Sequence, residues 1–213
     1  AGKGSITAGG DVFTEFLEYT TVKTKGNVQA NVILNSQVSA DQEVTLTGKK
    51  GLIAGGSVHG MLGISCITAG NMSEIRTGLH VGLKQETMEQ RIDVNERYSK
   101  VNQELEDTVA SMAKIMRVRQ QSGELSEPLQ KHLVELKRRK DEIYTRCMEI
   151  KKEANAMESM VLAAREAKIR VEGNIYHGVV ISIDNHDMVI NRDTSFMEYQ
   201  CQNGIITGTV VVV

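Results

Sequence analysis

A short motif recurs along the chain: an apolar residue, a turn of glycine or small polar residues, and a second apolar residue six positions after the first. It occurs at 6–12, 22–28, 38–44, 52–58, 66–72 and, far downstream, 169–175. The first five copies start 16, 16, 14 and 14 residues apart. So short a period, rich in Val, Ile and Gly, is typical of a β-solenoid, whose coils bury their inward residues against neighbouring coils. We therefore expect a parallel β-solenoid, a β-helix of right-handed type.

The residues between the fifth and sixth copies have a different composition. Residues 84–168 contain 17 basic and 16 acidic side chains but one glycine, Gly123, whereas the rest of the chain holds 18 of the 19 glycines. Glu, Lys, Arg, Met, Ala and Leu favour helix, and glycine favours turns with positive φ. We therefore expect a first part of the solenoid at 1–83, a helical insertion at 84–168, and a β return at 169–213 that completes the solenoid.

The insertion also has the apolar spacing of a coiled coil. Two series alternate by four and three residues: Val94, Tyr98, Val101, Leu105, Thr108, Met112 and Ile115, then Leu129, Leu133, Leu136, Lys140, Ile143, Cys147, Ile150, Ala154, Met157, Val161 and Ala164. Between them, Gly123 can end one helix, Ser126 can cap the next, and Pro128 suits a first turn. These seam series predict an antiparallel coiled-coil hairpin that projects roughly 55 to 60 Å.

Overall charge and cysteine content narrow the class of protein. A formal net charge of -2 gives no general attraction to nucleic acid or to anionic lipid. No apolar run approaches the ~18 residues of a membrane span, and no signal peptide is recognised at the start. The three cysteines, Cys66, Cys147 and Cys201, are odd in number and lie in apolar patterns. We expect them to be reduced core residues of a cytoplasmic protein.

One glycine-rich run has a superficial likeness to a phosphate-binding loop. Residues 48–56 read Gly-Lys-Lys-Gly-Leu-Ile-Ala-Gly-Gly, without the lysine followed by serine or threonine that defines such a loop. We predict a turn between coils with no helix after it, in which Lys49 and Lys50 are solvated charges or contacts to a partner.

The histidines do not suggest a metal site. None of His59, His80, His132, His177 and His186 is spaced from another His or from Cys as metal ligands are. No metal or other cofactor is expected. The segment 184–187, Asp-Asn-His-Asp, is predicted to form a hairpin turn with exposed carboxylates.

Two further patterns within 84–168 have ordinary structural explanations. The basic run 137–140 is flanked by acidic residues, so we expect a charge-balanced helix with Glu135–Arg139 and Arg138–Glu142 pairs rather than a nucleic-acid site. The methionines of the insertion are interpreted as seam or flank residues rather than an adaptable binding groove.

The motifs resemble those of the flagellar assembly protein A (FapA) family. The resemblance is carried by the turns at 9–12 and 26–30, the stretch 36–58 with its Gly-Lys-Lys-Gly-Leu-Ile-Ala-Gly-Gly run, and 173–179 after the helices. The order of β repeat, coiled-coil hairpin and β return is also that of the family. His177 stands where the family pattern has proline, and the family's region upstream of the repeat is absent from this sequence.

The resemblance implies a non-enzymatic cytoplasmic factor that acts in flagellar assembly or polar placement, located at the cell pole. Its implied partners are proteins of the flagellar or polar machinery and the glucose-specific phosphocarrier of the phosphotransferase system. We expect docking on the β body and on the hairpin, with Lys49, Lys50, Gly123, Glu124 and Leu125 as candidate contact residues, and homo-oligomers are possible.

Two other classes of protein remain open at this point. A polymer-forming solenoid of the bactofilin kind shares the Val, Ile and Gly repeats. The apolar segment 204–213 would pair either with the rest of its own chain or with a second copy. A solenoid enzyme, either an acyltransferase or a polysaccharide-active enzyme, would need coils of another length and convergent titratable groups. Spacings of 16 and 14 do not match the multiples of six of the hexapeptide acyltransferases.

Overall fold

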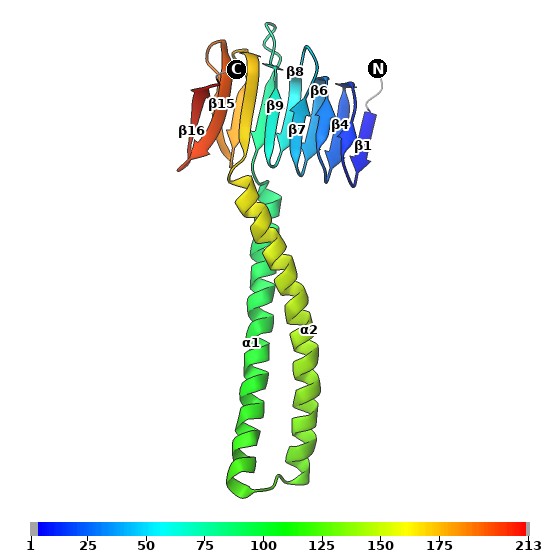
Figure 1. Ribbon diagram of the computed structural model, residues 1–213, viewed down its shortest axis with the longest axis vertical. Helices are drawn as coiled ribbons and strands as arrows, with labels where there is room; N and C mark the ends of the chain where they lie inside the picture. Colours follow the sequence, from blue (N-terminus) through cyan, green and yellow to red (C-terminus); the bar gives the residue numbers. More distant parts are fainter. Residues whose placement is uncertain (1–3, 212–213) are drawn as a thin grey trace. The chain divides into compact units, whose positions relative to one another are not determined.

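A computed structural model describes residues 4–211 (Figure 1). Its contacts divide the chain into two compact units, one from the residues up to Gln85 and from Val161 onward, the other from Glu86–Met160. The first unit contains the β-strands β1 (Gly4–Ala8), β2 (Val12–Phe13), β3 (Phe16–Glu18), β4 (Thr20–Thr24), β5 (Val28–Ala30), β6 (Val32–Ala40), β7 (Glu43–Leu46), β8 (Leu52–Gly60), β9 (Gly63–Cys66), β10 (Thr68–Ala69), β11 (Thr77–Val81), β12 (Lys168–Ile175), β13 (Val180–Ile183), β14 (His186–Val189), β15 (Thr194–Gln202) and β16 (Ile205–Val210).

The strands wind into coils with three faces, and each face stacks its strands in parallel. Face A consists of β1, β4, the second halves of β6 and β8, β11 and β13. Face B consists of β2, β5, β7, β9 and the start of β12. Face C consists of β3, the first halves of β6 and β8, β10 and the end of β12. The predicted parallel β-solenoid with a helical insertion is confirmed.

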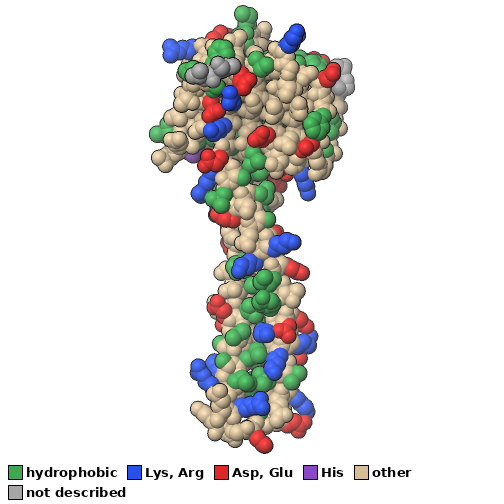
Figure 2. Space-filling model, in the orientation of Figure 1, with side chains coloured by type: hydrophobic (Ala, Val, Ile, Leu, Met, Phe, Trp, Pro, Cys, Tyr) green, Lys and Arg blue, Asp and Glu red, His purple; other side chains and the backbone are tan. Residues whose placement is uncertain are grey.

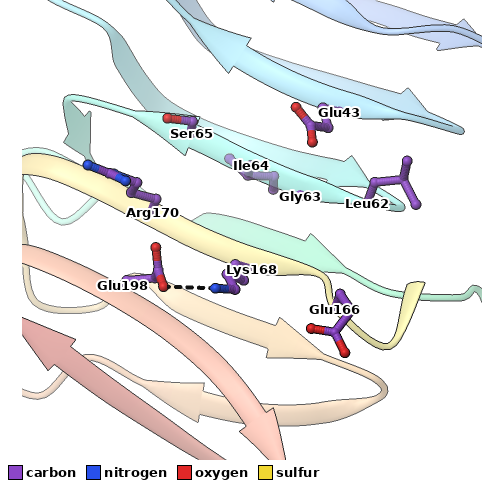
Figure 3. Close-up of a pocket in the computed structure, with 9 residues that line it drawn as sticks. All are labelled: Glu43, Leu62, Gly63, Ile64, Ser65, Glu166, Lys168, Arg170 and Glu198. Atoms are coloured by element: carbon purple, nitrogen blue, oxygen red, sulfur yellow. Dashed lines mark hydrogen bonds and ion pairs between the residues drawn. The ribbon is translucent and has the colours of Figure 1, made fainter. Parts of the chain in front are cut away.

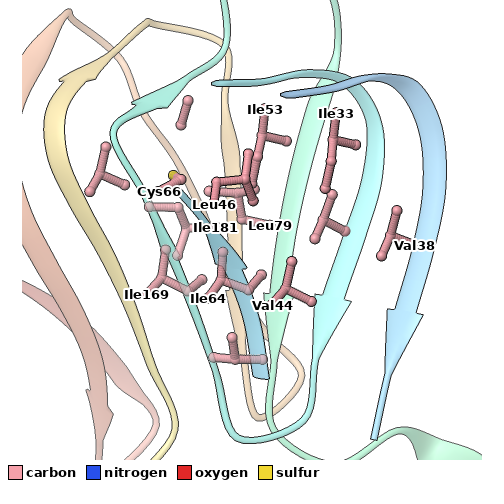
Figure 4. Packing of buried hydrophobic residues seen from close by; sticks show 14 of the residues in the cluster. Ile33, Val38, Val44, Leu46, Ile53, Ile64, Cys66, Leu79, Ile169 and Ile181 are labelled. Atoms are coloured by element: carbon pink, nitrogen blue, oxygen red, sulfur yellow. The ribbon is translucent and has the colours of Figure 1, made fainter. Parts of the chain in front are cut away.

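Columns of mostly apolar residues from the faces fill the interior, and faces A and B each contribute more than one such column. On face A the register aligns Ile6, Val22, Val38, Val58, Leu79 and Ile181. On face B it aligns Val12, Val28, Val44, Ile64 and Ile169. Apart from the first residue of each, these side chains are buried in one cluster, much of which Figure 4 shows. Because each coil covers the next, burial of branched aliphatic side chains is the main favourable term.

The β return continues the same stack across the insertion. Val81 is aligned with Gly60 before it and Ile183 after it, and Lys168 is aligned with Gly63. In the preceding coil only Met61 and Leu62 connect these two positions. The helical insertion therefore occupies the place of a two-residue turn between faces A and B.

The structure corrects the register of the later repeats. The first three copies are in phase, but Val38 is aligned with Val58 rather than with Leu52, and Ile169 belongs to face B with Ile64. The reason is that two later coils are enlarged at their corners. One corner residue, Asn31, is replaced in the next coil by 47–51, and the pair Ala54 and Gly55 is replaced by 70–76.

Sharp corners join face C to face A, and they require unusual backbone conformations. Tyr19, Asn35 and Gly55 occupy successive levels of this corner with φ of 48°, 47° and 78°. The Asn35 carboxamide lies under Gly55, where an added Cβ would come within 2.3 Å of its Oδ1. Glycine or asparagine is favoured here because both tolerate positive φ.

The helices α1 (Gln85–Ser122) and α2 (Glu127–Ala164) are joined by the short predicted break. Gly123 has φ of 77°, and Pro128 lies in the first turn of α2, as expected. Within the second unit, Val101 packs with Ile143, whereas the later Ile115 packs with the earlier Leu133, so the helices run in opposite directions. Every predicted seam position is buried or half-buried. The regular geometry of a coiled coil stays a prediction.

The ion pairs and the burial of the cysteines agree only in part with what the sequence predicted. Arg138 contacts Glu142 at 2.6 Å, as predicted, but Arg139 pairs with Glu104 of α1 at 2.9 Å instead of with Glu135. All three cysteines are free thiols; Cys66 and Cys147 are buried, whereas Cys201 is only half-buried. Neither described helix has a stretch apolar enough to cross a bilayer.

Candidate docking surfaces

The first coil ends the stack of described strands with an open edge. Among residues 4–211, β1, β2 and β3 each pair with a strand on one side only. This coil also exposes Phe13, Phe16 and Tyr19. Unpaired backbone groups beside exposed aromatic rings can accept a further strand or a partner surface.

The other end of the solenoid is built differently. β14 pairs antiparallel with β13, and β15 and β16 form an antiparallel pair on β12. Asp184 and Asn185 have positive φ in the β13–β14 turn, which confirms the predicted hairpin, although Asp184 is half-buried rather than exposed. The apolar tail therefore pairs with its own body as β16. Within residues 4–211 the two ends of the stack therefore differ, because the first coil offers parallel edges and the last strands pair antiparallel.

The predicted lysine contacts lie on the enlarged corner between faces B and C. Lys49 and Lys50 are exposed in a turn between β7 and β8. Because a strand follows this turn, it has no helix N-terminus to bind phosphate, as the sequence predicted. The turn is closed by Ile67, whose N–H donates to the Gly51 carbonyl at 3.0 Å. The two lysines are therefore exposed on a turn whose last residue is held by a backbone hydrogen bond to the next coil.

The other predicted contact residues lie in the loop between α1 and α2. Gly123 and Glu124 are exposed. Leu125 is buried against Ile115, Leu133 and other seam residues, so its side chain supports the loop from inside. Contact of this loop with a partner stays a prediction, and Glu124 is the side chain best placed to make it.

Face B has a shallow groove that no sequence pattern indicated, and Figure 3 shows the residues that line it. Gly63 is aligned with Glu43 on one side and Lys168 on the other, so the missing side chain leaves a hollow between them. Lys168 Nζ lies 3.3 Å from Oε1 of Glu198. Glu166 and Arg170 also line the hollow. Only the strand register brings these five charged groups together around one glycine.

Two histidines are aligned on the outer side of face A. His59 is aligned with His80, and the ring Nε2 of His59 is 3.1 Å from the Gly82 carbonyl oxygen. Burial, with Lys84 nearby, lowers the pKa of His59 to about 4, and burial also lowers the pKa of His80. Both rings are therefore neutral near pH 7. Residues 4–211 contain no group of three or more His, Cys, Asp or Glu placed to hold a metal ion.

His177 lies between two carboxylates, an arrangement that the sequence did not reveal. Its Nδ1 is 2.7 Å from Oδ1 of Asp193, and its Nε2 is 2.9 Å from Oε1 of Glu74. The Asp193 hydrogen bond, followed by that of Glu74, raises the pKa of His177 above its usual 6.5. The His177 backbone N–H and ring likewise lower the pKa of Asp193. The imidazolium thus ties the enlarged corner 70–76 to the segment after β14.

This arrangement predicts a specific pH dependence of stability. A raised histidine pKa stabilises the fold fully below about pH 6.5, and the contribution fades as pH rises through the folded-state pKa. We therefore expect His177→Gln to lower the urea midpoint most near pH 5 to 6, with a gap that narrows above neutrality. The measurement is urea unfolding of both proteins across that range. His132→Gln, at an exposed position in α2, is the control, and a gap independent of pH would contradict the assignment.

Fold and surface together define a class of protein: a parallel β-solenoid whose last full coil is opened by a helical hairpin. The family model described as the Flagellar Assembly Protein A beta solenoid domain matches residues 1–206. The chain belongs to this family, which confirms the resemblance found in its motifs. No match was found among curated proteins or among solved structures.

Proposed function

We propose that this protein is a non-enzymatic scaffold that acts in flagellar assembly by binding other proteins. The family match over residues 1–206 carries the proposal, because the family is one of flagellar assembly. The partners would be proteins of the flagellar or polar machinery, and the site of action would be the cytoplasmic side of the cell pole.

The character of the surface supports binding rather than catalysis. The interior of the first unit is filled by aliphatic side chains, and the groove of Figure 3 is shallow and lies on the outside of the sheet. An enzyme site usually needs a concave pocket with converging titratable groups. A flat face with charged groups at fixed spacing suits recognition of another protein instead.

Two surfaces of the β body are proposed to take part in docking. The Lys49 and Lys50 turn offers two exposed cations, and the groove on face B offers Glu43 and Glu166, which have no ion-pair partner among residues 4–211. A partner with an acidic segment would be recognised at the turn, and a partner lysine or arginine would fit the groove. The glucose-specific phosphocarrier is proposed as a candidate for either surface.

Photocrosslinking in cells tests this function. A photoreactive amino acid at Lys50 or Glu124 is expected to capture flagellar or polar proteins, whereas the same group at Gly9, an exposed turn residue, is not. Glu124 is preferred to Gly123 because the positive φ of Gly123 disfavours any side chain there. Captured proteins are identified by mass spectrometry. Recovery of no flagellar or polar protein from either position would count against the proposal.

A charge reversal gives a quantitative version of the same test. Lys49→Glu with Lys50→Glu is expected to reduce capture by a nearby crosslinker at Thr47 several-fold, because opposite charges at an interface rim accelerate association. Lys23→Glu with Lys25→Glu, on exposed positions of an earlier coil, is the matched control. Equal loss in both double variants would indicate a nonspecific effect of charge.

A further inference from the structure

The two flanks of the helical hairpin differ in chemistry. Successive helix positions are rotated by about 100°, so residues that directly precede a seam residue lie on one flank and those that directly follow one lie on the other. In an antiparallel pair, the corresponding flanks of the two helices fall on the same side. The hairpin therefore has two sides, each formed by one flank of α1 and the corresponding flank of α2.

The flank that precedes the seam is joined by ion pairs. Arg97 of α1 contacts Glu153 of α2 at 2.9 Å, and Glu104 contacts both Arg139 and Arg146. All five residues directly precede seam positions. We call this side the polar flank.

The flank that follows the seam has one printed ion pair between the helices, Arg91 with Glu158, and otherwise carries exposed apolar side chains among polar ones. The apolar residues that directly follow a seam residue are Val109, Ala113, Met116, Val134, Tyr144 and Met148, with Ile92 nearer the start of α1, and we call this side the apolar flank. Apart from Ala113, their exposed fractions lie between 42% and 66%. Figure 2 shows hydrophobic side chains gathered along the visible face of the hairpin. Met116 and Met148 lie on this flank, in agreement with their interpretation as seam or flank residues, and both are exposed. Exposed apolar side chains that gather on one side of a helical hairpin are typical of an interaction surface.

Charge along the hairpin is segregated as well. The half nearest the loop, residues 113–140, holds eight basic and three acidic side chains, whereas 86–112 and 141–160 together hold six basic and twelve acidic ones. Four of the tip cations, Lys114, Arg117, Arg119 and Lys137, have no ion-pair partner among the described residues. The tip is therefore electrically complementary to the base of the same hairpin.

We propose that two copies of this chain pair through their apolar flanks, with the hairpins antiparallel, to form a four-helix bundle. Two-fold symmetry then buries the same stripe on both copies, and the basic tip half of each hairpin lies against the acidic base half of the other. A parallel arrangement would bring the two basic tips together and is disfavoured. Because α1 spans Gln85–Ser122, a two-fold axis at its midpoint places Met116 opposite position 91 and next to Ile92 of the partner subunit.

The mass of the purified full chain in solution is the first test. Light scattering after size exclusion is expected to give twice the chain mass of 23.5 kDa. The double variant Val109→Glu with Met116→Glu is expected to elute as a folded monomer, because four buried charges would oppose the pairing. Val118→Glu is the matched control: it is an exposed aliphatic residue, seven positions after Ser111 on the polar flank, and the dimer should persist.

The orientation of the copies is a separate test. A photoreactive residue at position 116, in a mixture of isotopically labelled and unlabelled copies, is expected to form intermolecular crosslinks around Ile92 of the partner subunit. Crosslinks between the two 116 positions would overturn the antiparallel arrangement. Monomeric wild-type protein, fibres, or a dimer that survives the double variant would overturn the proposal itself. Because these measurements use purified protein, their outcome is independent of any flagellar partner.

Discussion

Replacing Gly56 with valine is expected to destabilise the solenoid more than any other single change considered. Gly56 has φ of 84°, and an added Cβ would lie 2.1 Å from the carbonyl oxygen of Ser36 in the preceding coil. Backbone strain costs about 1–3 kcal/mol and overpacking about as much again, so a loss of about 3–5 kcal/mol is expected. The backbone oxygen cannot move without breaking the β6–β8 ladder, which passes through this contact.

Urea unfolding followed by circular dichroism measures this loss. Gly9→Val is the matched control, because an added Cβ at Gly9 meets nothing within 4 Å. It should change the midpoint little. Similar midpoints for the two variants would mean that the corner can relax, and the close approach of the coils at Gly56 would then not be a constraint.

Removing the hairpin altogether is expected to leave the solenoid folded. Deletion of residues 83–166 joins Gly82 to Ala167, and the result, Val81-Gly82-Ala167-Lys168, reproduces the two-residue turn at Met61 and Leu62. The backbone supports this join, because the Gly82 N–H donates to the Met61 carbonyl at 3.1 Å. Circular dichroism should lose nearly all its helical signal and keep the β signal. Burial of Leu83 and Val161 is lost, so the midpoint should fall moderately.

A control deletion tests the register itself. Removing residues 82–167 joins Val81 directly to Lys168 and leaves no residue for the turn, so β11 and β12 cannot both keep their partners. This variant should be insoluble or lack a cooperative transition. If the two deletions behaved alike, the insertion would not replace a simple turn. The shorter deletion should also be monomeric, since the proposed dimer requires the hairpin.

Several features were predictable from the sequence because they depend on local chemistry. Apolar residues at fixed spacing predicted stacked coils, and the change from glycine-rich to charged, glycine-poor segments located the helices. Gly123 and Pro128 fixed the reversal between them. The turn at Lys49 and Lys50 was also predictable, because glycines flank it. The residues match no phosphate-binding pattern, so no helix was expected after it.

The phase of the later repeats was not predictable in the same way. Enlarging a corner by a few residues leaves the inward column intact while shifting the spacing in the sequence, as at 47–51 and 70–76. The pattern at Leu52–Val58 looked like a further copy because both residues are apolar, but Leu52 belongs to face C and Val58 to face A. Only cross-strand pairing distinguishes these assignments.

The sequence by itself determined the type of each segment, since backbone preference and the period of apolar residues act over neighbouring positions. Tertiary structure decided which distant residues meet: Gly63 with Glu43 and Lys168, and His177 with Glu74 and Asp193. Stacking brings together residues from different coils, and corner length sets their alignment. The set of side chains that meet on the surface of a solenoid therefore depends on the strand register. Hydrogen bonds between coils fix that register, and no local sequence pattern specifies it.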